Sequence, residues 1–94
     1  MSAAEAKRSI VVPNQQGVHL KPSMMIVKLA QSFASEVSIE NPEASTVAGA
    51  HLITEVMMLE APQGTELVVT AMGSDAEAAV EAMVNLIKSG FGEP

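Results

Sequence analysis

A histidine stands at the start of a helical sequence pattern. The segment Gly17-Val18-His19-Leu20-Lys21-Pro22-Ser23 leads from a loop into an amphipathic stretch. Proline is favoured in the first turn of a helix, because the N–H groups of that turn have no partner within the helix and proline has no N–H to leave unpaired. Pro22 therefore places His19 just before the helix or at its start.

An imidazole at a helix start has surroundings that favour a bound phosphate. Unpaired N–H groups and the positive end of the helix dipole attract anions, and Lys21 adds a positive charge. Gly17 lets the backbone turn closely without a side chain in the way. Neutral imidazole is a nucleophile near neutral pH, so we expect His19 to accept a phosphoryl group and later to release it. Because a lone histidine before a helix is more often a surface residue or an end cap, the spacing alone leaves that alternative open.

The composition excludes several other classes of function. A formal net charge of −6 with only five lysine and arginine residues argues against nucleic-acid binding, which depends on cationic side chains. The absence of cysteine removes disulfides, thiolate chemistry and the common zinc ligand sets. The two histidines, His19 and His51, have no suitable carboxylate spacing beside them, and no Walker-type glycine loop is present. We therefore expect no metal site and no cofactor, with His51 near the start of a short helix.

The length and the order of elements predict one small domain. With 94 residues, 48% of them apolar, the chain has room for a single core over residues 1–94, with residues 1–6 as a flexible N-terminus. Alternation and helical spacing predict the order β-α-β-β-α-β-α, with strands over 7–12, 36–40, 46–49 and 66–72 and helices over 22–33, 51–59 and about 75–88. The economical arrangement is an α+β fold, with a four-stranded antiparallel sheet covered on one face by three helices.

Helical spacing also separates core positions from surface positions. In the first two helices, core positions are predicted at Ile26, Leu29, Leu52, Val56 and Leu59. Three further apolar residues fall on other faces, and if the two helices lie side by side these form one patch beside His19: Met24, Ile53 and Met57. Such a patch suits partner docking, although single exposed apolar residues are common and leave a purely structural alternative.

Two further patterns concern the last helix and the termini. Ser74-Asp75-Ala76-Glu77 is read as a capping box that starts the last helix, which is expected to end near Gly90. No apolar run approaches the ~20 residues of a spanning helix, and residues 1–8 lack the apolar stretch of a secretory signal. We therefore expect a cytoplasmic protein that does not insert into a membrane.

The segment Gly-Val-His-Leu-Lys-Pro closely resembles the active-site signature of HPr, the histidine-containing phosphocarrier of the bacterial phosphoenolpyruvate-dependent sugar phosphotransferase system. The resemblance extends from about Arg8 to Lys88 and includes the Gln-Gly-Thr-Glu-Leu start of the last strand. It implies an open-faced β-sandwich and a monomeric carrier. It also implies that enzyme I phosphorylates His19, that Pro22 is the proline of the helix start, and that enzyme II A-type components receive the phosphoryl group.

The sequence departs from the HPr pattern at two places. Lys21 stands where the family usually has arginine, and an ammonium holds a phosphoryl group less rigidly than a bidentate guanidinium. The stretch Ala50-His51-Leu52-Ile53 has no hydroxyl where many Gram-positive members carry a regulatory serine. Regulation by serine phosphorylation is therefore not expected.

Three functions remain open at this point. The first is phosphoryl relay in sugar uptake, with the protein as a carrier and not as a free-standing enzyme. The second is the same chemistry in a regulatory, nitrogen-related branch. The third is an unphosphorylated interaction module that binds a partner through the surface of Met24, Ile53 and Met57.

Overall fold

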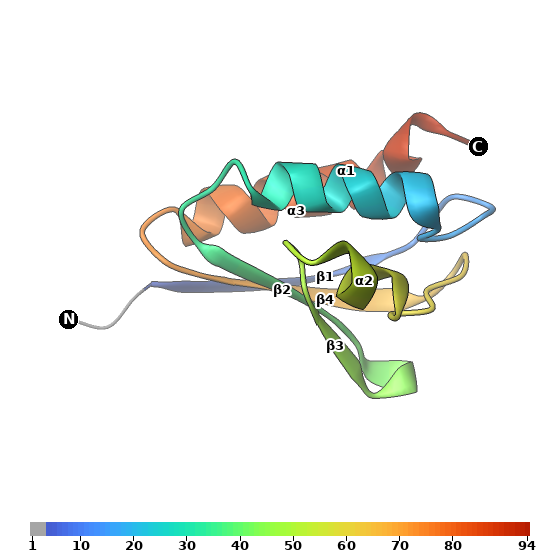
Figure 1. Ribbon diagram of the computed structural model, residues 1–94, viewed down its shortest axis with the longest axis horizontal. Helices are drawn as coiled ribbons and strands as arrows, with labels where there is room; N and C mark the ends of the chain where they lie inside the picture. Colours follow the sequence, from blue (N-terminus) through green and yellow to red (C-terminus); the bar gives the residue numbers. More distant parts are fainter. Residues whose placement is uncertain (1–3) are drawn as a thin grey trace.

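The computed structural model describes residues 4–94, and it confirms the predicted order of elements (Figure 1). Four strands form one antiparallel sheet in the order β1-β4-β2-β3, and three helices cover one of its faces. Within residues 4–94, no helix is long and apolar enough to cross a membrane. The strands are β1 (Glu5–Val11), β2 (Glu36–Asn41), β3 (Thr46–Gly49) and β4 (Glu66–Met72), and the helices are α1 (Leu20–Ala30), α2 (Ile53–Met57) and α3 (Ala76–Lys88).

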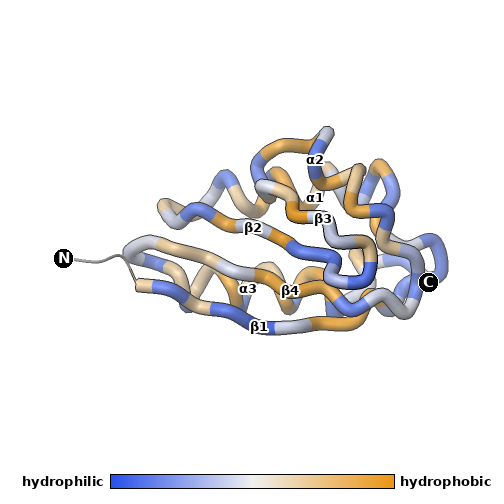
Figure 2. The backbone as a smooth tube through the Cα atoms, turned by 90° about the horizontal axis from the view of Figure 1, so that it is seen from below, coloured by the Kyte–Doolittle hydropathy of each residue, from blue (hydrophilic) through white to orange (hydrophobic). Residues whose placement is uncertain are grey.

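The sheet separates a buried face from an open one, because successive side chains of a strand point to opposite sides. Figure 2 shows the four strands side by side, and along β2 hydrophilic and hydrophobic positions alternate. In the two central strands, Val37 and Ile39 of β2 and Leu67 and Val69 of β4 are buried beneath the helices. Ile39 of β2 lies opposite Val69 of β4, so the buried apolar side chains of the two strands lie on the same face of the sheet.

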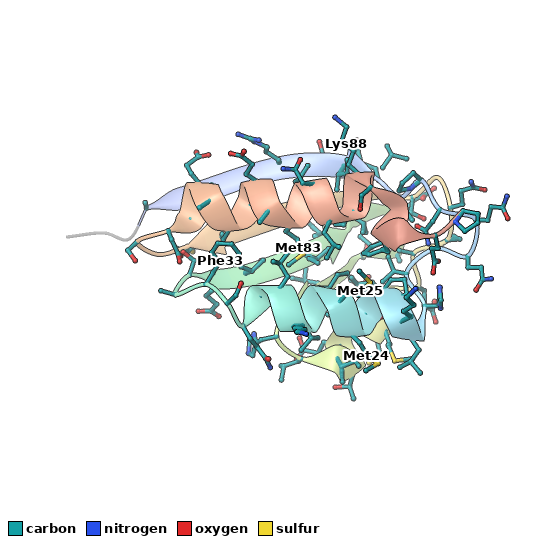
Figure 3. The ribbon with its side chains drawn as sticks, turned by 90° about the horizontal axis from the view of Figure 1, so that it is seen from above. Met24, Met25, Phe33, Met83 and Lys88 are labelled. Atoms are coloured by element: carbon teal, nitrogen blue, oxygen red, sulfur yellow. The ribbon has the colours of Figure 1, made fainter. Side chains whose placement is uncertain are left out.

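Helices α1 and α3 lie side by side on the sheet and run in opposite directions (Figure 1). Figure 3 shows Met83 of α3 between the two helices, where it is buried. Ile26 of α1 and Val56 of α2 are also fully buried, as the helical spacing predicts. The predicted core position Leu29 is only partly buried, although it packs against the core.

Leu52 is a wrong core prediction. Its side chain is 43% exposed, because Leu52 has an extended backbone and only precedes α2. The helix has five residues instead of the nine predicted over 51–59, so Leu52 does not share the helical face of Val56 and Leu59.

Other boundaries move by two or three residues. Strand β1 begins at Glu5, and Glu5 and Ala6 pair with Met72 and Ala71, so the expected flexible N-terminus does not include these two residues. Positions 1–3 of that expectation lie outside the described residues. Helix α1 starts two residues before the predicted 22–33 helix and ends three residues earlier. The Ser32 hydroxyl donates to the Leu29 carbonyl oxygen just after this end, a local bond that competes with helix continuation.

The predicted capping box at Ser74 is also wrong. Helix α3 begins at Ala76 with Asp75 as its N-cap residue, and no side chain caps the helix. The Asp75 carboxylate instead accepts hydrogen bonds from the Ser35 hydroxyl and from the N–H groups of Ala34 and Ser35. The Ser35 hydroxyl bond, followed by the Ala34 N–H bond, holds the pKa of Asp75 below its usual value. The aspartate therefore ties the start of α3 to the loop between α1 and β2.

Candidate functional site

The loop before α1 is pressed against the segment that precedes β4. Gly17 has a positive φ of 68°, and a Cβ atom at this position would lie 2.3 Å from the Ala61 carbonyl oxygen and 2.7 Å from the Pro62 Cα. The next residue along, Val18, donates its N–H to the same Ala61 oxygen at 2.9 Å. Only glycine fits this turn, which fixes the backbone two residues before His19.

His19 is the N-cap residue of α1, in the position that the sequence predicts. Its carbonyl oxygen accepts the first helical hydrogen bond from the Ser23 N–H at 2.9 Å and a second bond from the Ser23 hydroxyl at 2.7 Å. Pro22 lies buried in the first turn, where it forfeits no helical bond. The His19 side chain is 35% exposed, so an external group can reach the ring.

The chain returns to this loop after α3. Helix α3 ends as expected before Gly90, which has a positive φ of 70°. The short 3-10 segment η2 (Gly90–Gly92) follows, with Phe91 buried, and the Gln15 N–H then donates to the Pro94 carbonyl oxygen at 2.9 Å. Figure 1 shows this C-terminal end beside the start of α1.

Glu93 of the returning segment holds the His19 ring. The Glu93 Oε1 atom lies 2.8 Å from His19 Nε2. Asn14, which is buried, donates its Nδ2 amide to the same oxygen at 2.9 Å and to the Gly17 carbonyl oxygen at 2.8 Å. Hydrogen bonds from His19 and then from Asn14 hold the pKa of Glu93 below its usual value. Glu93 is therefore an ionised acceptor at neutral pH, and His19 donates to it through Nε2–H. In the neutral ring this arrangement leaves the lone pair on Nδ1.

Sequence reasoning missed Glu93 and Asn14. Glu93 follows the last predicted helix and lies in no predicted element, yet its side chain is only 16% exposed. The available signal was Gly90-Phe91-Gly92 directly after the predicted helix end. Phe91, one of only two aromatic residues in the chain, lies there between two glycines. Its burial places the next part of the chain, which contains Glu93, against the rest of the protein.

Lys21 is exposed in the first turn of α1. Lys21 is two positions after His19 in the chain, and its positive charge makes a smaller contribution to the lowered pKa of Glu93 than the hydrogen bonds do. Among residues 4–94 Lys21 forms no ion pair, and its ammonium is available to an external anion.

The three apolar residues predicted to form a patch lie on neighbouring helices. Met24 of α1 is 55% exposed, Met57 of α2 is 45% exposed, and Ile53 is partly exposed. Helices α1 and α2 are in contact, and Figure 3 shows Met24 on the side of α1 that faces away from α3. His51 is exposed just before α2.

Comparison with known proteins gives a consistent result. The family model for the PTS HPr component phosphorylation site matches residues 6–89. The phosphocarrier protein NPr of Escherichia coli K12 is 34% identical over 87 residues, covering 93% of this chain and 96% of that protein. Two solved structures are similar: HPr-C-His from Thermoanaerobacter tengcongensis (TM-score 0.87, 32% identity, 95% and 98% of the two chains) and HPr from Bacillus anthracis (TM-score 0.83, 27% identity, 89% and 98%).

Proposed function

Because the chain belongs to the HPr family of phosphocarriers, we propose that His19 is its phosphoryl acceptor. His19 receives the group from phosphorylated enzyme I and passes it to an enzyme II A-type component. The observation that supports this most strongly is the Nε2–Glu93 hydrogen bond at the start of α1, which leaves Nδ1 as a nucleophile on a partly exposed ring. After incubation with phosphoenolpyruvate and enzyme I, an acid-labile mass gain of one phosphoryl group supports the proposal, and no gain contradicts it.

The chemistry needs no proton transfer at the histidine. The Nδ1 lone pair attacks phosphorus, the N–P bond forms, and the bond between phosphorus and the donor breaks. The ring then carries a positive charge, and Nε2 keeps its hydrogen toward Glu93. The Leu20 and Lys21 N–H groups have no partner within the helix, because the first helical bond comes from Ser23, and they favour the phosphoryl oxygens.

A second candidate is carriage in a regulatory, nitrogen-related branch of the phosphotransferase system. Similarity to the protein named NPr favours this branch. The two candidates differ in partners, so purified enzyme I and A-type proteins of each branch distinguish them. If the transfer rate is at least about tenfold higher with the proteins of one branch, the chain is assigned to that branch. Equal transfer rates with the proteins of both branches would contradict a dedicated role in either. The third function, an unphosphorylated interaction module, requires an inert His19.

Lys21 is expected to screen the phosphoryl charge. Lys21→Glu places a negative charge beside the incoming group, so phosphoryl transfer from enzyme I should fall by about tenfold or more, in line with about 1.4 kcal/mol for each factor of ten. Lys21→Arg should keep or raise the rate, because guanidinium can bind two phosphoryl oxygens at once. The measurement is the initial phosphorylation rate, with Lys28→Glu near the other end of α1 as the control. A normal rate in Lys21→Glu would remove Lys21 from the site.

The exposed patch of Met24, Ile53 and Met57 is proposed as the docking surface for enzyme I. Methionine adapts to different partners, and a small patch suits brief contacts. Met24→Glu should slow transfer at limiting enzyme I, while changing the free energy of unfolding by less than about 0.5 kcal/mol. The measurement is transfer rate against enzyme I concentration, alongside thermal melting.

Met72 provides the control for this variant. It is 50% exposed at the end of β4 that pairs with Glu5, away from the segment that contacts Gly17. Met72→Glu should transfer at the normal rate. Equal rates in Met24→Glu and Met72→Glu would move the docking surface elsewhere, and a strongly lowered melting temperature for Met24→Glu would assign Met24 to the core.

A further inference from the structure

We propose that Glu93 is a positioning residue for His19, which selects the ring tautomer that accepts the phosphoryl group and balances the charge of the phosphorylated ring. The inference rests on the proposed function and deepens it. Its basis is the Glu93 carboxylate, which lies 2.8 Å from His19 Nε2 although the two residues are 74 positions apart in sequence.

Glu93 is held in place without the help of His19. The buried Asn14 amide donates to Glu93 Oε1 and to the Gly17 carbonyl oxygen, so one side chain links the carboxylate to the loop before α1. On the chain before Glu93, Phe91 is buried, with only 1% of its surface exposed. On the other side, the Pro94 carbonyl oxygen accepts the Gln15 N–H. The residues on both sides of Glu93 in the chain are therefore held in place, and the carboxylate has a fixed position next to the ring.

A fixed carboxylate decides which ring nitrogen reacts. Neutral imidazole has two tautomers, and an acceptor at one nitrogen holds the hydrogen there and leaves the lone pair on the other. Glu93 holds the hydrogen on Nε2, so the lone pair stays on Nδ1 and the ring cannot rotate freely about its bond to Cβ. A histidine without this partner would spend part of its time in the unreactive tautomer or in another orientation.

The same carboxylate matches the charge that appears during transfer. When the N–P bond forms at Nδ1, the ring becomes a cation that keeps its hydrogen on Nε2, and the negative carboxylate stabilises it. When the phosphoryl group leaves, its bonding electron pair returns to Nδ1 and the starting tautomer is restored. Lys21 and Glu93 thus act on charges of opposite sign. The lysine balances the negative charge of the phosphoryl group, and the glutamate balances the positive charge of the ring.

The test compares Glu93→Ala, which removes the acceptor, with Glu93→Gln, which keeps an acceptor oxygen but removes the charge. Glu81→Ala, at an exposed position on α3, is the matched control. The first readout is the ¹⁵N NMR signal of the His19 ring nitrogens in the unphosphorylated protein above pH 8, with the exposed His51 as an internal reference. The second readout is the rate of phosphorylation by enzyme I, and thermal melting verifies that each variant is folded.

The wild-type His19 signals should show one tautomer with the hydrogen on Nε2. Glu93→Ala should shift them toward a mixture and slow phosphorylation by about tenfold or more, as expected when a hydrogen bond to a charged group is lost. Glu93→Gln should keep more of the tautomer while still slowing transfer, and the His51 signals should not change. These results would not follow from a merely structural role of the segment.

Two outcomes would overturn the inference. One is an unchanged His19 tautomer in folded Glu93→Ala, and the other is an altered tautomer with an unchanged phosphorylation rate. A wild-type protein that accepts no phosphoryl group would overturn the proposed function instead. The ring signals of the unphosphorylated protein would still decide in that case whether Glu93 sets the tautomer.

Discussion

His19→Ala is expected to abolish phosphoryl acceptance, whereas His51→Ala should accept one phosphoryl group at the normal rate. His19 combines a partly exposed ring, a position at a helix start and a carboxylate that is hydrogen-bonded to Nε2. Among the described residues, no carboxylate is hydrogen-bonded to the ring of His51. The measurement is the intact protein mass after incubation with phosphoenolpyruvate and enzyme I. Phosphorylated His19→Ala would place the acceptor at another residue.

The loss in His19→Ala must come from chemistry and not from unfolding. The side chain of His19 is one third exposed and does not cap its own helix, so its removal should leave the melting temperature within a few degrees of the wild type. A second variant, His19→Gln, keeps a polar side chain of similar length and should also fail to accept the group. Both variants together separate the missing nucleophile from a disturbed loop.

Gly17→Ala is expected to destabilise the fold by about 3 kcal/mol. The new methyl group would meet the Ala61 carbonyl oxygen, and overpacking against a backbone that cannot move aside costs about 1–3 kcal/mol. The positive φ adds about 1–2 kcal/mol for any residue with a Cβ. Urea unfolding measures the change in the free energy of unfolding.

Gly64 separates these two contributions. It also has a positive φ, of 89°, but a Cβ at this position would have no neighbour within 4 Å. Gly64→Ala should therefore cost only the backbone strain of about 1–2 kcal/mol. Equal losses in the two variants would mean that the close approach of Gly17 to Ala61 contributes nothing to stability.

Local sequence patterns were sufficient for most of the fold. The strands over 46–49 and 66–72 were predicted with their observed bounds, because alternation and the flanking turn residues both act over a few positions. The short α2 was predicted too long, since its helical spacing continued through Leu52, which is extended, and through Met58 and Leu59, which form a turn after the helix. The Ser74 box failed because Asp75 bonds to a loop 40 residues away, a partner that no local pattern contains.

In the candidate site, too, some residues could be predicted from local sequence and others could not. Gly17, His19, Lys21 and Pro22 lie within six consecutive positions, so their order alone predicted a histidine at a helix start. Glu93 and its contact with Asn14 depend on where the chain goes after α3, and that path is set by the burial of Phe91. Long-range hydrogen bonds of this kind are fixed by packing and not by spacing.

Phosphoryl attachment to Nδ1 of His19 is tested most directly by ³¹P and ¹⁵N NMR of the protein labelled with ¹⁵N-histidine and phosphorylated by enzyme I. We predict one phosphorus signal coupled to the Nδ1 nitrogen of His19, with the Nε2 nitrogen of the same ring still bearing its hydrogen. Coupling to Nε2, to a nitrogen of His51, or to no histidine nitrogen would contradict the site described above.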